Sequence, residues 1–351
     1  MMRQIGATTP APQYADNLTI ATTLLSAGLS FPRPPALAGS SRFDRYTRRM
    51  FELWIPITIV AAFCQNLRSA LQKHLKSQLT TAGATYVRFF YAWPFALFYV
   101  WGLNYWGGLA LPQPNGEFLL YCVLGGATQI LSTALMIWMF SFRNFAVGTT
   151  YSKTEIIQVA FLGLILLGDT ISFTAAIAIS ISVVGIMAMS VAQTHISVSS
   201  LITGMTEKAT LIGLASGAFL GASVVLFRGA ALALNHDSVV MAAAFALAVS
   251  VVLQTVAMGI YLLFRERNTL TAVVRHWRWA LPVGVAGVMG SIAWFTAFTL
   301  QNAAYVRALG QIELVFTFIA SFFFFKEKMT LLEFFGIASI VTGILIIVLL
   351  G

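Results

Sequence analysis

Ten long apolar stretches follow one another along this chain, separated by short polar links. A helix needs about 20 mostly apolar residues to cross roughly 30 Å of bilayer hydrocarbon. The stretches are continuously apolar, whereas strands of a membrane barrel alternate between apolar and polar positions. We therefore predict an all-α integral membrane protein with ten transmembrane helices. They are placed at residues 53–73, 83–103, 117–140, 145–167, 171–192, 210–233, 239–264, 279–299, 303–325 and 331–350.

The scarcity of charge agrees with a chain that is dissolved in lipid. Of its 351 residues, 58% are hydrophobic and only 9% are charged, whereas a soluble domain carries about 25% charged residues. The net charge of +9 does not indicate a nucleic-acid partner, because the basic residues are scattered over loops and helix ends. The four histidines and two cysteines show no metal-ligand spacing. We therefore predict membrane lipid as a partner, and no nucleic acid, metal or cofactor.

The chain also repeats itself. When residues 126–186 are shifted by 158 positions, Asn144 falls on Asn302 and Glu155 falls on Glu313. Such residues are rare in so apolar a chain, so their coincidence in register indicates duplication. We predict a disordered, basic tail, two five-helix units and a linker between the units. Their bounds are 1–50 for the tail, 51–192 for the first unit, 193–209 for the linker and 210–351 for the second unit.

An odd number of helices in each unit has a topological consequence. Five crossings force the second unit to insert upside down relative to the first. Inverted repeats of this kind are a recurring plan of transporters, and the substrate then binds near the bilayer midplane where the repeats meet. The sequence therefore predicts two inverted five-helix repeats with a site between them.

Ionisable side chains inside the predicted spans are candidates for that site. Each costs at least about 2.5–3.5 kcal/mol near the bilayer centre and usually faces a cavity or a partner. In a continuous helix over 145–167, Tyr151, Glu155 and Gln158 share one face. Lys153 lies about 200° from Glu155. The candidate substrate-binding or coupling residues are Glu155, Glu313, Lys153, Gln311, Arg307, Arg68, Tyr151, Gln158, Trp138 and Tyr305.

The two glutamates allow more than one interpretation. Glu155 and Glu313 occupy matching places in the repeat, so two carboxylates could face one cavity and bind a cation, a proton or an ammonium group. An alternative of equal weight is that a nearby Arg or Lys neutralises each carboxylate and locks helices together. Arg88 and Arg228 are weaker candidates, because a long side chain near a helix end can snorkel to the interface.

Two stretches resemble the EamA-like branch of the drug/metabolite transporter superfamily. They run from Asn144 to Glu155, Asn-Phe-Ala-Val-Gly-Thr-Thr-Tyr-Ser-Lys-Thr-Glu, and from Asn302 to Glu313, Asn-Ala-Ala-Tyr-Val-Arg-Ala-Leu-Gly-Gln-Ile-Glu. An acidic residue then ends each apolar run, at Asp169 and Glu327. The pattern implies a mid-helix break in each stretch. This sequence departs from it by carrying Glu155 and Glu313 where members often have Pro.

The resemblance implies alternating-access transport. Similar proteins export amino acids and other metabolites, sometimes coupled to protons, and some move nucleotide sugars or lipid-linked sugars. We predict a non-enzymatic secondary active transporter in the cell (inner) membrane, an exporter of a small polar metabolite such as an amino acid. Its predicted partners are that metabolite, lipid and protons, and the chain acts as a monomer or homodimer. A nucleotide-sugar or lipid-linked sugar transporter is the alternative within the superfamily.

Two further classes of function differ from a transporter. An intramembrane enzyme needs a nucleophile with a base, or clustered carboxylates or histidines, and no histidine lies in the middle of a predicted span. A channel generally needs symmetric rings of residues around a pore, which two inverted halves do not provide. A non-transporting membrane scaffold would use the same helices without a substrate.

Overall fold

The computed structural model describes residues 41–75, 79–139, 141–142, 145–194, 203–323 and 330–350. The chain divides into Met1–Arg45, of which only the last five residues are described, and Tyr46–Gly351. Most of the predicted tail, together with Asn144 and Glu327, lies outside the described residues. Residues 41–50, which we predicted to be part of the tail, form the first turns of a helix.

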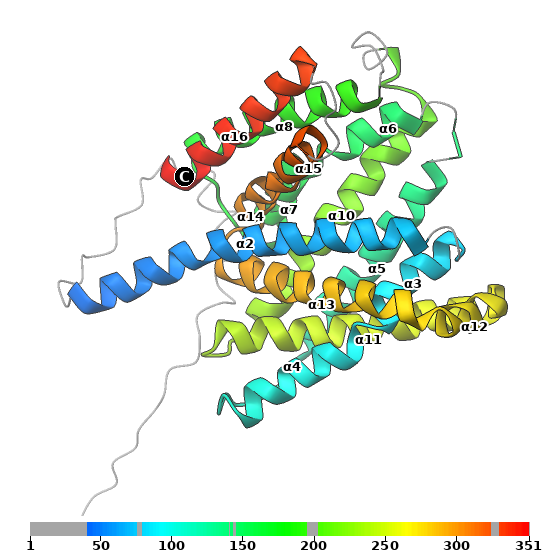
Figure 1. Ribbon diagram of the computed structural model, residues 1–351. Coiled ribbons are helices and arrows are strands. Elements are labelled where there is room, and N and C mark those ends of the chain that lie inside the picture. Colours follow the sequence, from blue (N-terminus) through cyan, green and yellow to red (C-terminus); the bar gives the residue numbers. More distant parts are fainter. Residues whose placement is uncertain are drawn as a thin grey trace, which may run out of the picture. The chain divides into compact units, whose positions relative to one another are not determined.

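Every regular element in the described part of the chain is an α-helix (Figure 1). The helices are α2 (Ser41–Leu75), α3 (Thr81–Phe90), α4 (Trp93–Tyr105), α5 (Gly116–Met139), α6 (Phe145–Ser152), α7 (Glu155–Leu167), α8 (Phe173–Thr194), α10 (Lys208–Ala233), α11 (Val239–Arg265), α12 (Arg267–Arg275), α13 (Trp277–Leu300), α14 (Ala303–Gly310), α15 (Ile312–Phe323) and α16 (Leu331–Leu350).

Seven segments of the described chain are long and apolar enough to cross a bilayer. Many of their large apolar side chains are exposed, for example Leu120 of α5, Phe161 of α7 and Leu345 of α16. Soluble monomers rarely expose apolar patches of more than a few hundred Å². The protein is therefore a multi-pass integral membrane protein, and its division into ten spans and two repeats stays a prediction.

Three of the ten predicted spans are interrupted helices. The segment 83–103 divides into α3 and α4, where Pro94 occupies the first turn of α4, a position that proline tolerates. The segment 145–167 divides at Lys153 and Thr154, and the segment 303–325 divides at Gln311. The last two breaks differ by the shift of 158 found in the sequence, since Lys153 corresponds to Gln311.

The break between α6 and α7 forms without proline. The Ser152 hydroxyl donates to the Thr149 carbonyl oxygen at 2.8 Å, and the Thr154 hydroxyl donates to the Tyr151 carbonyl oxygen at 2.7 Å. Hydroxyl groups that bond to the backbone in this way compete with the helical ladder and bend it. The predicted common face of Tyr151, Glu155 and Gln158 is therefore wrong, because Tyr151 belongs to a different helix from the other two.

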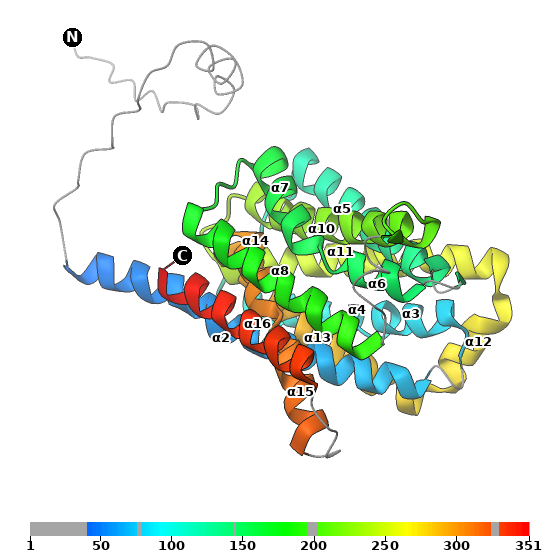
Figure 2. The same cartoon turned by 90° about the horizontal axis from the view of Figure 1, so that it is seen from above.

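Close helix packing holds these elements together. α5 packs along α10, and α8 packs along α16, as Figures 1 and 2 both show for the second pair. Where α10 meets α6, a side chain on Gly213 would collide with the backbone of Gly148. Small residues allow this approach, and van der Waals contact then replaces the hydrophobic effect, which is absent between helices in lipid.

Candidate functional site

Glu155 and Arg307 form an ion pair between the two predicted units. Glu155 begins α7 directly after the helix break and is only 5% exposed, and Arg307 lies in the last turn of α14. A helix N-terminus stabilises an anion and a C-terminus stabilises a cation, because the peptide dipoles align along the helix. Both half-helices thus present the end that favours the charge they carry. For Glu155, the structure shows the neutralised carboxylate of our second interpretation.

A chain of contacts leads from this ion pair to Glu313. The Arg307 guanidinium lies 5.3 Å from the ring centroid of Trp294 in α13. The Trp294 indole N–H donates to Gln65 Oε1 of α2 at 3.1 Å, and Gln65 Nε2 donates to Glu313 Oε2 of α15 at 2.5 Å. The two carboxylates that the repeat pairs are therefore the two ends of one network. We call these five residues the glutamate network.

Neither Gln65 nor Trp294 was among the predicted site residues. Each has a feature in the sequence that indicates a buried polar contact. Gln65 is an uncharged polar residue within an apolar span, and such a residue usually makes a hydrogen bond between helices. Trp294 is a tryptophan far from a span end, where its indole N–H needs an acceptor.

Three other predicted residues lie around the two helix breaks. Gln311 occupies the second break, is buried, and donates to the Arg307 carbonyl oxygen at 3.3 Å. Gln158 of α7 donates to the Thr154 hydroxyl at 3.3 Å. Lys153 lies in the first break, is partly buried, and forms no ion pair with any described residue.

The predicted aromatic residues lie apart from the glutamate network. Tyr151 packs with Met187 and Val191 of α8. The Tyr305 hydroxyl accepts a hydrogen bond from the Ser172 backbone N–H at 3.1 Å. Trp138, near the end of α5, is 57% exposed. Their role as lining of a substrate cavity stays a prediction.

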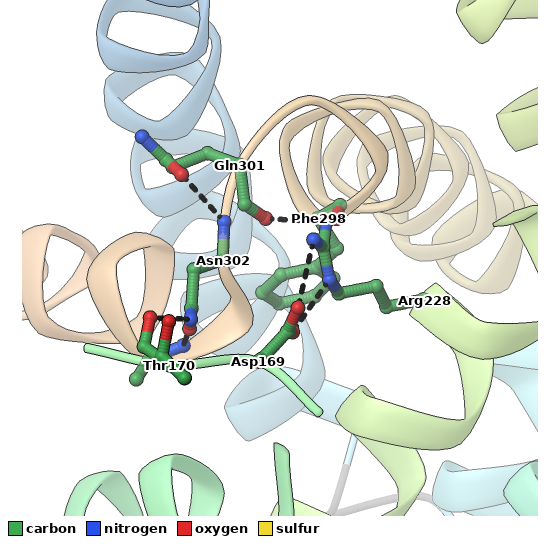
Figure 3. A network of polar contacts seen from close by, with 7 residues as sticks. Asp169, Thr170, Arg228, Phe298, Gln301 and Asn302 are labelled. Carbon is green, nitrogen blue, oxygen red and sulfur yellow. Dashed lines mark hydrogen bonds and ion pairs between the residues drawn. The ribbon is translucent and has the colours of Figure 1, made fainter. Parts of the chain in front are cut away.

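A second buried ion pair joins Arg228 of α10 to Asp169, which follows α7 (Figure 3). Arg228 Nε lies 2.8 Å from Asp169 Oδ2, and Nη2 lies 3.2 Å from Oδ1. Nη1 donates to the carbonyl oxygens of Phe298 and Gln301 at the end of α13. These terminal carbonyls have no partner within their helix. Arg228 was ranked as a weaker candidate because it could snorkel, but its guanidinium is bound inside the protein.

The chain after α13 continues the same network. Gln301 Oε1 accepts from the Asn302 backbone N–H at 2.8 Å, and Asn302 Nδ2 donates to the Thr170 carbonyl oxygen at 3.4 Å (Figure 3). The Asn302 side chain also caps α14 by accepting from the Ala304 backbone N–H at 2.9 Å. The end of α7 is thereby connected to the start of α14.

The chemistry of these networks is ion pairing and hydrogen bonding. Among the described residues, no group of three or more His, Cys, Asp or Glu side chains could hold a metal ion. The networks provide polar contact between the two predicted units, and the Glu155–Arg307 pair lies next to a helix interruption in each unit.

Comparison with known proteins identifies the family of the second unit. Residues 207–349 match the model of the EamA-like transporter family, which belongs to the drug/metabolite transporter superfamily. This part of the chain is similar to EamA-like transporters. The resemblance found in the sequence motifs is confirmed, and the EamA-like family indicates a membrane transporter.

A solved structure has a similar fold. Its title reads "Crystal structure of protein", and it matches with a TM-score of 0.55 at 14% sequence identity. The match covers 84% of this chain and 99% of that chain. At this identity the likeness shows the fold alone. No curated protein matches the chain.

Proposed function

We propose that this protein is a secondary active transporter that moves a small polar metabolite by alternating access. The glutamate network is the observation that supports this most. It places an ion pair between interrupted helices of the two predicted units. Its two hydrogen bonds join the continuous helix α2 of the first unit to α13 and α15 of the second. Interrupted helices at a repeat interface are where transporters of this plan bind substrate, and one repeat then rocks against the other.

The network also supports a different role for each of the two glutamates. Arg307 neutralises Glu155, so we propose that this pair is a lock between the units that opens and closes during transport. Glu313 accepts a hydrogen bond from the neutral amide of Gln65 and forms no ion pair with any described residue. We therefore propose Glu313 as the proton-coupling residue, with transport driven by the proton gradient.

The finer assignments rest on the resemblance to the EamA-like family and are proposals. We propose an amino-acid-like metabolite, export as the direction, the cell (inner) membrane as the location, and no enzymatic activity. A carrier of nucleotide sugars or lipid-linked sugars remains the alternative substrate class within the superfamily.

The test is counterflow in proteoliposomes that contain the purified full-length protein. Vesicles loaded with one unlabelled amino acid or nucleotide sugar should take up the labelled compound transiently and saturably. Glu155→Gln should strongly reduce this exchange, whereas Glu117→Gln should not, because Glu117 is an exposed residue at the start of α5. An ion current without saturable counterflow would contradict the proposal and favour a channel.

A further inference from the structure

A second polar site lies where α3, α5, α11 and α13 meet. An enclosed cavity of about 30 Å³ is bounded by apolar side chains and by four polar residues, Arg88, Gln129, Gln254 and Ser291. One water molecule occupies about 30 Å³ in the liquid. In this conformation the cavity is therefore closed around a space too small for a metabolite, and a solute enters only when these helices separate.

The positive charge at this cavity is not balanced within the described chain. Arg88 was ranked as a weaker candidate because it could snorkel, yet it lines the cavity, and its guanidinium lies 4.9 Å from the ring centroid of Phe89. No described residue forms an ion pair or side-chain hydrogen bond with it. The other two arginines treated above, Arg228 and Arg307, both pair with carboxylates.

Arg68 of α2 adds a second cation beside the first. A Cβ atom built on Gly287, a cavity residue, would lie 3.5 Å from Arg68 Cδ and 3.9 Å from the Arg88 carbonyl oxygen. Arg68 Nε is buried and has no hydrogen-bond partner among the described residues. The carboxylate of Glu313 in α15 does not line the cavity. Removing an ion from water costs several kcal/mol unless a counter-charge compensates it.

The neutral polar residues also offer donors to the cavity. Gln254 Nε2 donates to Gln129 Oε1 at 2.7 Å. The Gln129 amide group therefore keeps both of its N–H donors, since it donates to no described residue. Ser291 adds a hydroxyl group. A guanidinium, an amide N–H and a hydroxyl together match the oxygen atoms of a carboxylate or phosphate.

We propose that this cavity is the anion-binding site of the transporter, and that the transported solute carries a carboxylate or a phosphate bound by Arg88. The proposal rests on the proposed transport function and narrows its substrate class. Gln129 and Ser291 donate to the same anionic group, and Arg68 strengthens the field around it. An amino group is not required, because no described carboxylate lines the cavity.

Binding is tested by thermal unfolding of the full-length protein with small probes of matched size. Succinate, aspartate and inorganic phosphate are the anionic probes, succinamide is the neutral probe and 1,4-diaminobutane is the cationic probe. We expect a saturable rise in Tm with succinate and aspartate, or with phosphate, because a ligand that binds only the folded state stabilises it. A response to the acids alone assigns a carboxylate, and a response to phosphate alone assigns a phosphate ester.

Substitutions then locate the site. Arg88→Gln should weaken anion binding about 10- to 100-fold, as expected for the loss of hydrogen bonds to a charged group. It should also raise the Tm of the ligand-free protein, because it removes an uncompensated cation. Arg278→Gln is the matched control, since Arg278 lies 5.9 Å from the Trp277 ring but is exposed, and it should change neither value. Ser291→Ala provides a second variant, with a smaller loss of affinity.

Two results would overturn the anion site. One is a rise in Tm with succinamide or 1,4-diaminobutane that equals the rise with the anions. The other is a rise in Tm with the anions that is unchanged in Arg88→Gln and Ser291→Ala. Counterflow separates this outcome from failure of the transport proposal. Anion binding without counterflow of any probe overturns transport and leaves the site in place. Counterflow of a cationic or neutral probe that survives Arg88→Gln overturns the anion site and leaves transport in place.

Discussion

The surroundings of Glu155 and Glu313 differ, although the sequence repeat gives the two residues equivalent positions. Each lies in the first turn of a half-helix directly after a break. Glu155 is buried against the Arg307 guanidinium, whereas Glu313 is partly buried against the neutral amide of Gln65. The two halves thus share a helix break before the glutamate, but the partner of the carboxylate differs between them. The comparison teaches that a repeated backbone position can pair its carboxylate with a cation in one half and with a neutral amide in the other.

Breaking the lock should have the largest effect on stability. Arg307→Gln leaves the buried Glu155 carboxylate without its counter-charge, and removing one partner of a buried pair costs about 3–5 kcal/mol. The free energy of unfolding, measured by denaturant titration in detergent micelles, should fall by that amount. The double variant Glu155→Gln/Arg307→Gln should recover most of the loss. A double variant as unstable as the single one would contradict an ion-pair lock.

Disturbing the residue between the two glutamates should have an intermediate effect. A Cβ atom on Gly310 would lie 2.5 Å from Trp294 Cη2, so Gly310→Ala forces the indole to move. Overpacking of this kind costs about 1–3 kcal/mol. Tryptophan fluorescence and the free energy of unfolding should both change. Gly116→Ala is the control, because a side chain there meets no other atom within 4 Å.

Neutralising Glu313 should change stability least. Glu313→Gln removes no ion pair and keeps a hydrogen-bonding partner for Gln65, so the cost should be about 1 kcal/mol or less. Transport should nevertheless lose its response to an imposed pH gradient while counterflow at equal pH persists. A pH response equal to that of the unchanged protein would remove Glu313 from proton coupling and make the two glutamates alike.

The apolar stretches predicted the helices well, because the length and the apolar pattern of a segment can be read from neighbouring residues alone. The helix breaks were harder to place. Ser152 and Thr154 are a local signal for the first break, but the second, at Gln311, has no comparable pair of hydroxyl groups. An angle of 100° per residue holds only within one helix. The face predicted for Tyr151 therefore failed once the helix was interrupted.

The partners of buried charges could not be predicted from spacing along the chain. Arg228 and Asp169 are 59 residues apart, and Glu155 and Arg307 are 152 apart. Only the packing of the helices brings them together. The sequence does show which charged residues lie within apolar spans, where a charge costs free energy unless it has a partner. This is why Arg307 and Glu155 were among the predicted residues.

The interruption between α6 and α7 differs from one made by proline, since residues 152–155 keep every backbone N–H group. Two hydroxyl-to-carbonyl bonds maintain it, and each contributes only about 1 kcal/mol net. Backbone bonds of a tightened turn accompany them, since the Lys153 N–H donates to the Thr150 carbonyl oxygen at 3.2 Å and the Thr154 N–H donates to the Tyr151 carbonyl oxygen at 3.1 Å. A continuous helix would place Glu155 differently relative to Arg307. The proposed opening of this ion pair therefore depends on the two hydroxyl groups that hold the break.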